Sequence, residues 1–168
     1  MNAKALKTAV ASNPTAEAFS VFEATQKTAG IRPALAYLAA RSDYRFVGIY
    51  RFDAEKLVSV AHHDKLHPDV ERVATVPVNA SYCCFVRDSK GSFAVNDSLA
   101  DAALAGHPKR AVSRAYCGVP ILDPEGQLLG ALCHYDAVPR DAGRLDLDLL
   151  RQVASALAGA LASPKRSD

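Results

Sequence analysis

Residues 115–135 read AYCGVPILDPEGQLLGALCHY, which is two apolar runs joined by a turn. The order Asp-Pro-Glu-Gly at 123–126 suits a type I turn followed by a glycine in the left-handed conformation. That combination is the three-residue hairpin loop with a bulge, and it pairs Asp123 with Gln127. The segment therefore predicts an antiparallel hairpin of strands 115–122 and 127–135.

The same register has a consequence for two cysteines of the hairpin. It places Cys117 directly opposite Cys133, on one face of the sheet, with their Cβ atoms about 4.5–5.5 Å apart. A slip of one residue would send the two side chains to opposite faces. Two interpretations stay open for the pair: small apolar core residues, or thiols with a redox or ligand-contact role.

Length and composition set outer limits. The chain has 168 residues, which matches one domain of about 100–200 residues. Hydrophobic residues make up 49% and charged residues 23%, so the chain can bury a core and disorder is not expected. No apolar run approaches the roughly 20 residues of a membrane span. A net charge of +2 without a clustered basic face argues against nucleic-acid binding.

Outward from the hairpin, the pattern predicts helices and further strands on both sides. Asn13-Pro14-Thr15 begins a helix that Gly30 ends, and Ser81, or alternatively Asn79, caps a second short helix. The stretch from 62 to 75 is polar and permits a helix, and 99–112 is expected to be a loop with one or two helical turns. The remaining predicted elements are helices 32–40, 82–88 and 145–161, strands 44–52, 57–61 and 92–95, and an extended segment 76–78. This order is typical of an α+β fold with a mostly antiparallel sheet.

The four cysteines are Cys83, Cys84, Cys117 and Cys133. No secretory signal precedes them, so a cytoplasmic location and free thiols are expected. Structural zinc usually takes ligands two to four residues apart, whereas the close pair here is adjacent, so no metal is predicted.

Four motifs in order carry a resemblance to a known family. They are SYCCFVR at 81–87, FAVNDS at 93–98, YCGVPI at 116–121 and GALCHYD at 130–136. Together they resemble bacterial sensory GAF domains over roughly residues 18–161. The resemblance implies a six-stranded antiparallel sheet, with the terminal helices on one face and a helix-and-loop layer enclosing a ligand pocket on the other.

GAF domains mostly bind small molecules and pass the signal through their terminal helices. We therefore predict a stand-alone, non-catalytic sensory domain over residues 14–162, with tails at 1–13 and 163–168. Its ligand and cofactor stay unidentified, and its output would pass through a homodimer or a separate signalling protein, without nucleic acid or membrane. Ala154, Ala158 and Leu161 widen the apolar side of the last helix, either toward a second subunit or against the sheet.

The pocket is expected to be lined from the helix near 82–85, the loop near 97–107, and the strands of the hairpin. Asp97 would accept hydrogen bonds from a ligand or cap the next turn, and capping is the commoner role. The predicted ligand-binding residues are Tyr82, Cys83, Cys84, Phe85, Asp97, His107, Cys117, Cys133 and Tyr135.

The sequence also offers alternatives to this function. A free methionine sulfoxide reductase of the GAF fold would use Cys83 or Cys84, but its further cysteine is absent from 109–113 and its acid before the Val-Pro pair is replaced. Phytochrome-type domains attach a bilin to a Cys-His dipeptide on a pocket helix, whereas Cys133-His134 lies on a predicted strand. His62, His63 and His67 would suit a metal only if their stretch were helical. A protein-interaction scaffold without a ligand is the last alternative.

Overall fold

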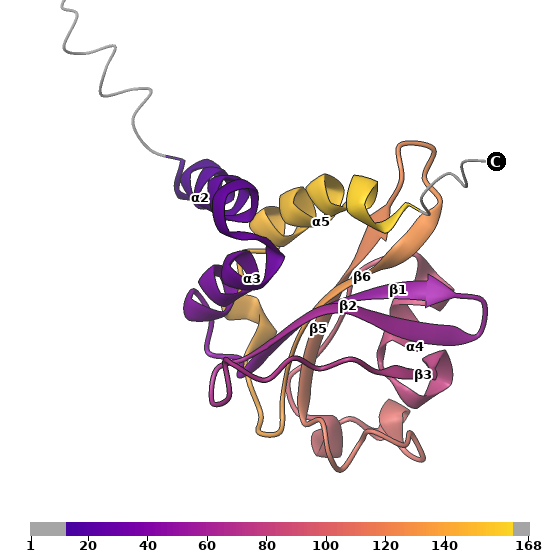
Figure 1. Ribbon diagram of the computed structural model, residues 1–168. Coiled ribbons are helices and arrows are strands. Elements are labelled where there is room, and N and C mark those ends of the chain that lie inside the picture. Colours follow the sequence, from indigo (N-terminus) through magenta and orange to yellow (C-terminus); the bar gives the residue numbers. More distant parts are fainter. Residues whose placement is uncertain (1–12, 163–168) are drawn as a thin grey trace, which may run out of the picture.

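The computed structural model describes residues 13–162, and Figure 1 shows a central sheet with a helical layer on either side. The predicted tails lie outside these residues, apart from Asn13. The sheet is antiparallel throughout, with the strand order β3-β2-β1-β6-β5-β4. The strands are β1 Phe46–Asp53, β2 Lys56–Asp64, β3 Thr75–Pro77, β4 Phe93–Val95, β5 Ala115–Leu122 and β6 Leu128–Asp136. The predicted α+β fold with a six-stranded sheet is confirmed.

Three helices cover one face of the sheet: α2 Pro14–Ala29, α3 Ile31–Ala40 and α5 Leu147–Leu161 (Figure 1). Asn13 caps α2 by accepting hydrogen bonds from the backbone of Thr15 and Ala16, as predicted from the sequence. Asp146 caps α5 and also accepts a 2.6 Å hydrogen bond from the Thr15 hydroxyl. The two terminal helices are therefore joined where each begins. Their apolar sides form one core with the sheet, which includes Phe22, Leu35, Ile49, Leu132 and Leu157.

The broad apolar surface of α5 packs within the chain. Ala154, Ala158 and Leu161 are each less than a tenth exposed and belong to the core between α5 and the sheet. The sequence feature that suggested a subunit contact is thus explained by packing within one copy. The homodimer itself stays a prediction.

The opposite face carries the irregular layer. It contains α4 Cys83–Ser89 and the 3-10 turns η1 Val78–Ala80, η2 Ser98–Ala100 and η3 Ala102–Leu104. A further turn, η4 Ala142–Arg144, leads into α5. The predicted cap at Ser81 or Asn79 is wrong: the N-cap of α4 is Tyr82, whose side chain makes no capping hydrogen bond. Ser81, one residue earlier, accepts a hydrogen bond from the backbone N–H of Cys83 at 3.2 Å. A second core lies here and includes Val78, Val86, Leu104, Tyr116 and Ala131.

The register predicted for the hairpin is confirmed at the turn and is wrong along the strands. The Asp123 N–H donates to the Gln127 carbonyl at 2.9 Å, and Gly126 has φ +82°, as the turn type requires. A bulge then shifts the pairing by one residue between Leu122 and Ile121, so Cys117 lies opposite His134. Cys133 pairs with Gly118 instead. Because side chains alternate along a strand, Cys117 and Cys133 point to opposite faces.

The polar stretch 62–75 is not helical. Its first residues continue β2 to Asp64, whose carboxylate pairs with the Arg45 guanidinium at 2.8 Å. Pro68 disfavours helical backbone at His67, and the chain turns there. It then runs back along β2, where the N–H of Ser59 donates to the Ala74 carbonyl at 2.9 Å. His63 and His67 therefore do not share a helix face.

Candidate ligand-binding cavity

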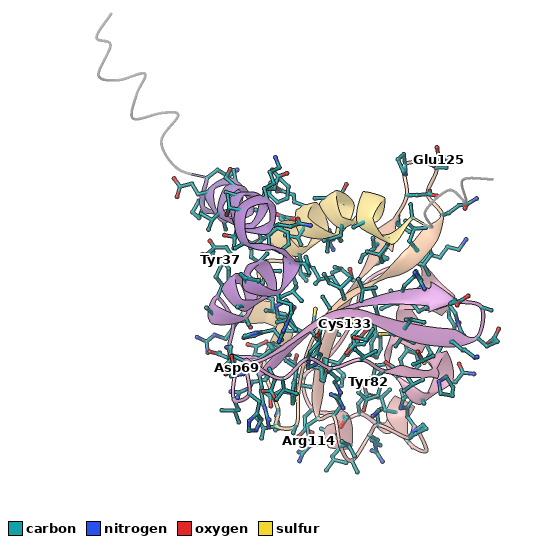
Figure 2. All side chains as sticks on the ribbon, in the orientation of Figure 1. Tyr37, Asp69, Tyr82, Arg114, Glu125 and Cys133 are labelled. Atoms are coloured by element: carbon teal, nitrogen blue, oxygen red, sulfur yellow. The ribbon has the colours of Figure 1, made fainter. Side chains whose placement is uncertain are left out.

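A cavity of about 360 Å³ lies between the sheet and the irregular layer. Its floor comes from β1, β2, β5 and β6, and its walls come from β3, the start of α4 and the segments near 72–74 and 109–113. Figure 2 shows Tyr37 among the terminal helices and Tyr82 on the other side of the sheet, where the cavity lies. Much of the lining is apolar, with Phe46, Leu57, Ala74, Val76, Val112 and Ala137 among its members.

Two tyrosines of the floor lie flat over glycines of their own strands. Tyr50 on β1 covers Gly48, where an added Cβ would come within 2.6 Å of the ring. Tyr116 on β5 covers Gly118, where a Cβ would come within 2.3 Å of the tyrosine hydroxyl. The sequence places each glycine two residues from its tyrosine, hence on the same face. The missing side chains leave the space in which the rings lie.

A hydroxyl and two thiols form the first polar cluster of the cavity. The Tyr116 Oη lies 3.3 Å from Cys83 Sγ and 3.0 Å from Cys133 Sγ, and the two sulfurs are 3.4 Å apart. Hydrogen bonding from Cys133 lowers the pKa of Cys83, whereas burial raises the pKa of Cys133 well above its usual value. Burial also raises the pKa of Tyr116, so its hydroxyl is a neutral donor at pH 7. Cys83 is thus the more acidic thiol of the pair.

The second polar cluster is centred on Tyr135. Its hydroxyl lies 2.6 Å from His62 Nε2 and 3.1 Å from the Tyr50 hydroxyl, and Arg72 Nη1 donates to it at 3.4 Å. Burial lowers the pKa of His62 to about 4, so the ring is neutral near pH 7. With Nε2 as acceptor, Tyr135 donates to His62 and accepts from Tyr50 and Arg72, which fills the capacity of one hydroxyl.

Positive charge predominates among the charged side chains that line the cavity. Arg72 and Lys109 contribute a guanidinium and an ammonium group. The lining carboxylate of Asp136 accepts hydrogen bonds from Arg140 Nε at 2.8 Å and from the backbone N–H of Arg45 at 3.0 Å. Its negative charge is therefore offset by Arg140.

Four of the nine predicted site residues line this cavity: Tyr82, Cys83, Cys133 and Tyr135. They come from α4 and β6, two elements that the sequence had placed at the pocket. The Tyr82 hydroxyl donates to the Ser113 carbonyl at 3.0 Å and so ties the start of α4 to the loop before β5.

Three other predicted residues pack beside the cavity. The ring centroid of His107 lies 4.7 Å from that of Tyr82 and 5.7 Å from that of Phe85. Phe85 stacks on Phe93 with 4.5 Å between ring centroids. The Cys84 sulfur lies 3.9 Å from His107 Nε2. His107, Phe85 and Cys84 thus build an aromatic wall behind Tyr82.

The remaining two predicted residues point elsewhere. Asp97 accepts a hydrogen bond from the N–H of Leu99 at 3.1 Å and pairs with Arg114 through both oxygens, at 2.8 and 2.9 Å. This ion pair lowers the pKa of Asp97. Cys117 is buried on the helical side of the sheet, where desolvation raises its pKa to about 11. The bulge in the hairpin is the reason that Cys117 does not share a face with Cys133, which lines the cavity.

The comparison with protein families agrees with this architecture. The GAF domain family matches residues 23–161. The chain belongs to the GAF family. No curated protein matches it. The matched range runs from α2 to the end of α5 and so contains the sheet, both layers and the cavity.

Solved structures with the same fold include proteins of different function. A GAF domain from an Acinetobacter phosphoenolpyruvate-protein phosphotransferase is 14% identical with a TM-score of 0.71, covering 90% of this chain and 94% of that chain. A phycoerythrobilin-bound GAF domain from a cyanobacterial phytochrome is 14% identical with a TM-score of 0.67, covering 90% and 96%. Free methionine-R-sulfoxide reductase from Neisseria meningitidis, in complex with its substrate, is 20% identical with a TM-score of 0.61, covering 90% and 89%. At identities this low, the TM-scores show a shared fold and nothing further.

Two further findings bear on the predicted function classes. None of the helices within residues 13–162 is long and apolar enough to cross a membrane. Over the same residues, no group of three or more His, Cys, Asp or Glu side chains is arranged to hold a metal ion.

The polar lining residues that were not predicted from the sequence include Tyr50, Arg72, Lys109 and Tyr116. His62, which the sequence offered only as a metal ligand, hydrogen-bonds to the lining residue Tyr135. The glycines two positions from Tyr50 and Tyr116 were a readable signal, since a glycine within a strand often marks a close approach. Arg72 and Lys109 lie in irregular segments, where periodicity carries no information on side-chain direction.

Proposed function

We propose that this GAF domain is a non-catalytic sensory module whose cavity binds a compact apolar molecule carrying an acidic group. The observation that supports the proposal is the cavity itself. Its volume of about 360 Å³ falls within the roughly 300–1,000 Å³ of small-molecule sites. Apolar walls with a few converging polar groups are the usual composition of such sites.

The charge of the lining favours an acid. Arg72 and Lys109 face the cavity, while Asp136 is occupied by Arg140. Guanidinium groups bind carboxylates and phosphates through parallel hydrogen bonds. The hydroxyl of Tyr135, which already accepts from Arg72, lies beside the position that such an anion would take.

Thermal denaturation with a panel of apolar carboxylates and phosphates, each beside its neutral amide or alcohol, tests this proposal. A ligand at 100 times its Kd stabilises the folded state by about 2.7 kcal/mol. We expect the acids to stabilise the protein more than their neutral counterparts, and Arg72→Gln to remove the difference. Lys27→Gln, at an exposed position of α2, is the matched control. Equal stabilisation by acids and neutral analogues contradicts the anion preference, and no stabiliser in a broad panel favours an interaction scaffold.

A second candidate is a thiol-dependent reductase, because Cys83 and Cys133 both line the cavity. Cys84 and Cys117, which the sequence also offered for this role, do not contribute to the described lining. Activity on free methionine sulfoxide with a dithiol reductant, lost in Cys83→Ser and kept in Cys117→Ser, would replace the sensory proposal.

The output is proposed to pass through the terminal helices, either in a homodimer or to a separate signalling protein. These helices lie on the far side of the sheet from the cavity, so the strands connect the two. Val21 on α2 is 45% exposed and is a side chain that such a contact would cover.

A further inference from the structure

Two of the four thiols meet inside the cavity. Cys83, at the first position of α4, and Cys133, in the middle of β6, are fifty residues apart in sequence, and their sulfurs are 3.4 Å apart. Both side chains are essentially closed to bulk solvent but line the cavity of about 360 Å³. A small solute that enters the cavity therefore meets both sulfurs together.

From this geometry we infer that Cys83 and Cys133 are a redox-active dithiol, which a hydroperoxide oxidises to a disulfide within one chain. The sulfurs are already in contact at 3.4 Å, and a disulfide requires that they approach to about 2.05 Å. The inference does not rest on the proposed acidic ligand, because it uses only the sulfurs and the open space above them.

The roles within the pair differ. Cys83 has the lower pKa, owing to hydrogen bonds from Cys133, Ser81 and Tyr116, so Cys83 is the thiol that supplies a thiolate. The pKa of Cys133 is raised by burial, so Cys133 is protonated until Cys83 has reacted. The Tyr116 hydroxyl touches both sulfurs and keeps them on the cavity floor.

The reaction balances in two steps. The Cys83 sulfur attacks one oxygen of the hydroperoxide, the O–O bond breaks, and the leaving oxygen takes the former thiol proton to become an alcohol, or water from hydrogen peroxide. Cys83 is then a sulfenic acid. The Cys133 sulfur attacks the Cys83 sulfur, the S–O bond breaks, and hydroxide leaves as water with the Cys133 proton. Two sulfurs have lost two electrons, and the two peroxide oxygens have gained them.

The other two cysteines are matched controls. Cys84 follows Cys83 directly, but its sulfur lies beside His107 and its pKa is raised by burial. Cys117 lies on the other face of the sheet. Neither belongs to the pair, so neither is needed for the oxidation.

The test is to treat the reduced full chain with one equivalent of hydrogen peroxide, block the remaining thiols with N-ethylmaleimide, and map the peptides without reduction. In Cys84→Ser, where Cys83 is the single cysteine of its peptide, we expect a cross-link between Cys83 and Cys133 and loss of two thiols per chain. Cys117→Ser should behave as the wild type does. Cys83→Ser and Cys133→Ser should lose the cross-link entirely.

The wild-type map keeps the inference falsifiable even if a cysteine variant fails to fold. A bond between Cys83 and Cys84, a bond between two chains, or oxidation of Cys83 beyond the sulfenic acid without a link to Cys133 would each overturn it. Recovery of both free thiols from the cross-linked protein after dithiothreitol treatment is also expected. A product that dithiothreitol does not reverse would count against a disulfide.

Discussion

Acidification from pH 7 to pH 5 should destabilise this protein strongly, because two buried histidines are held neutral. His62 hydrogen-bonds to Tyr135, which lines the cavity. His134 lies on the other face of the sheet, where the Tyr44 ring meets it edge-on with 5.9 Å between ring centroids. Burial lowers the pKa of each to about 4, from an ordinary value near 6.5. Nearby positive charge acts in the same direction, from Arg72 at His62 and from Lys65 at His134.

The sign follows from proton binding. Between pH 6.5 and pH 4 the unfolded chain binds protons at these histidines and the folded chain does not, so stability falls as pH falls. Because the pKa of each histidine is about 2.5 lower in the folded chain than in the unfolded chain, each reduces the free energy of unfolding by about 2 kcal/mol at pH 5 and by about 3 kcal/mol at pH 4. Both together remove about 4 kcal/mol at pH 5, which is a large part of the 5–15 kcal/mol typical of domains. Asp64, with a pKa lowered to about 2, affects stability only below pH 4.

Urea denaturation at pH 7, 6 and 5, followed by circular dichroism, measures this loss. His62→Gln and His134→Gln should each reduce the difference between pH 7 and pH 5 by about 2 kcal/mol, because a glutamine does not titrate. His67→Gln, at an exposed position, is the control and should leave the difference unchanged. A free energy of unfolding that is constant from pH 7 to pH 5, or a full loss that persists in the double variant, would refute the reasoning.

Two more expectations concern packing and assembly. Gly118→Ala should lower the free energy of unfolding by about 1–3 kcal/mol, because its Cβ would come within 2.3 Å of the Tyr116 hydroxyl. Gly159→Ala, on the exposed side of α5, meets nothing within 4 Å and should be neutral or stabilising. Urea denaturation measures both variants, and equal effects would contradict the close approach at Gly118. Light scattering after size-exclusion chromatography should give twice the mass of one chain if the proposed homodimer forms, and the mass of one chain at all concentrations would exclude it.

Sequence patterns predicted those parts of the fold that local chemistry determines. The capped start of α2 at Asn13, the turn at 123–126 and the limits of β5 follow from residue types whose preferences act over a few positions. The composition of 62–75 permits a helix, but Pro68 disfavours helical backbone at His67. In the structure, the pair between Asp64 and Arg45 instead ends an extended strand.

The register of the hairpin could not be read from the same patterns. In a strand with one solvent-exposed face, the alternation of polar and apolar residues indicates the register. Because β5 and β6 are buried on both faces, either register would bury apolar or small side chains. The bulge next to Leu122 carries no glycine or other distinguishing residue at the extra position, Leu129. The energetic difference between the registers lies in packing against α5 and the irregular layer, which the hairpin sequence alone does not contain.

That single bulge determines the chemistry of the cavity. In the register predicted from the turn, Cys117 and Cys133 would share a face, and the cavity would hold both or neither. In the observed register the Cys133 sulfur lies 3.4 Å from the Cys83 sulfur. His134 and Cys117, which lie opposite each other, face the terminal helices. Residues adjacent in sequence thus lie in different layers, since Cys133 belongs to the cavity and His134 to the face covered by the terminal helices. A change at the hairpin that removed the bulge would place Cys117 and Cys133 on one face, and would so change which side chains reach the cavity without substituting any of them.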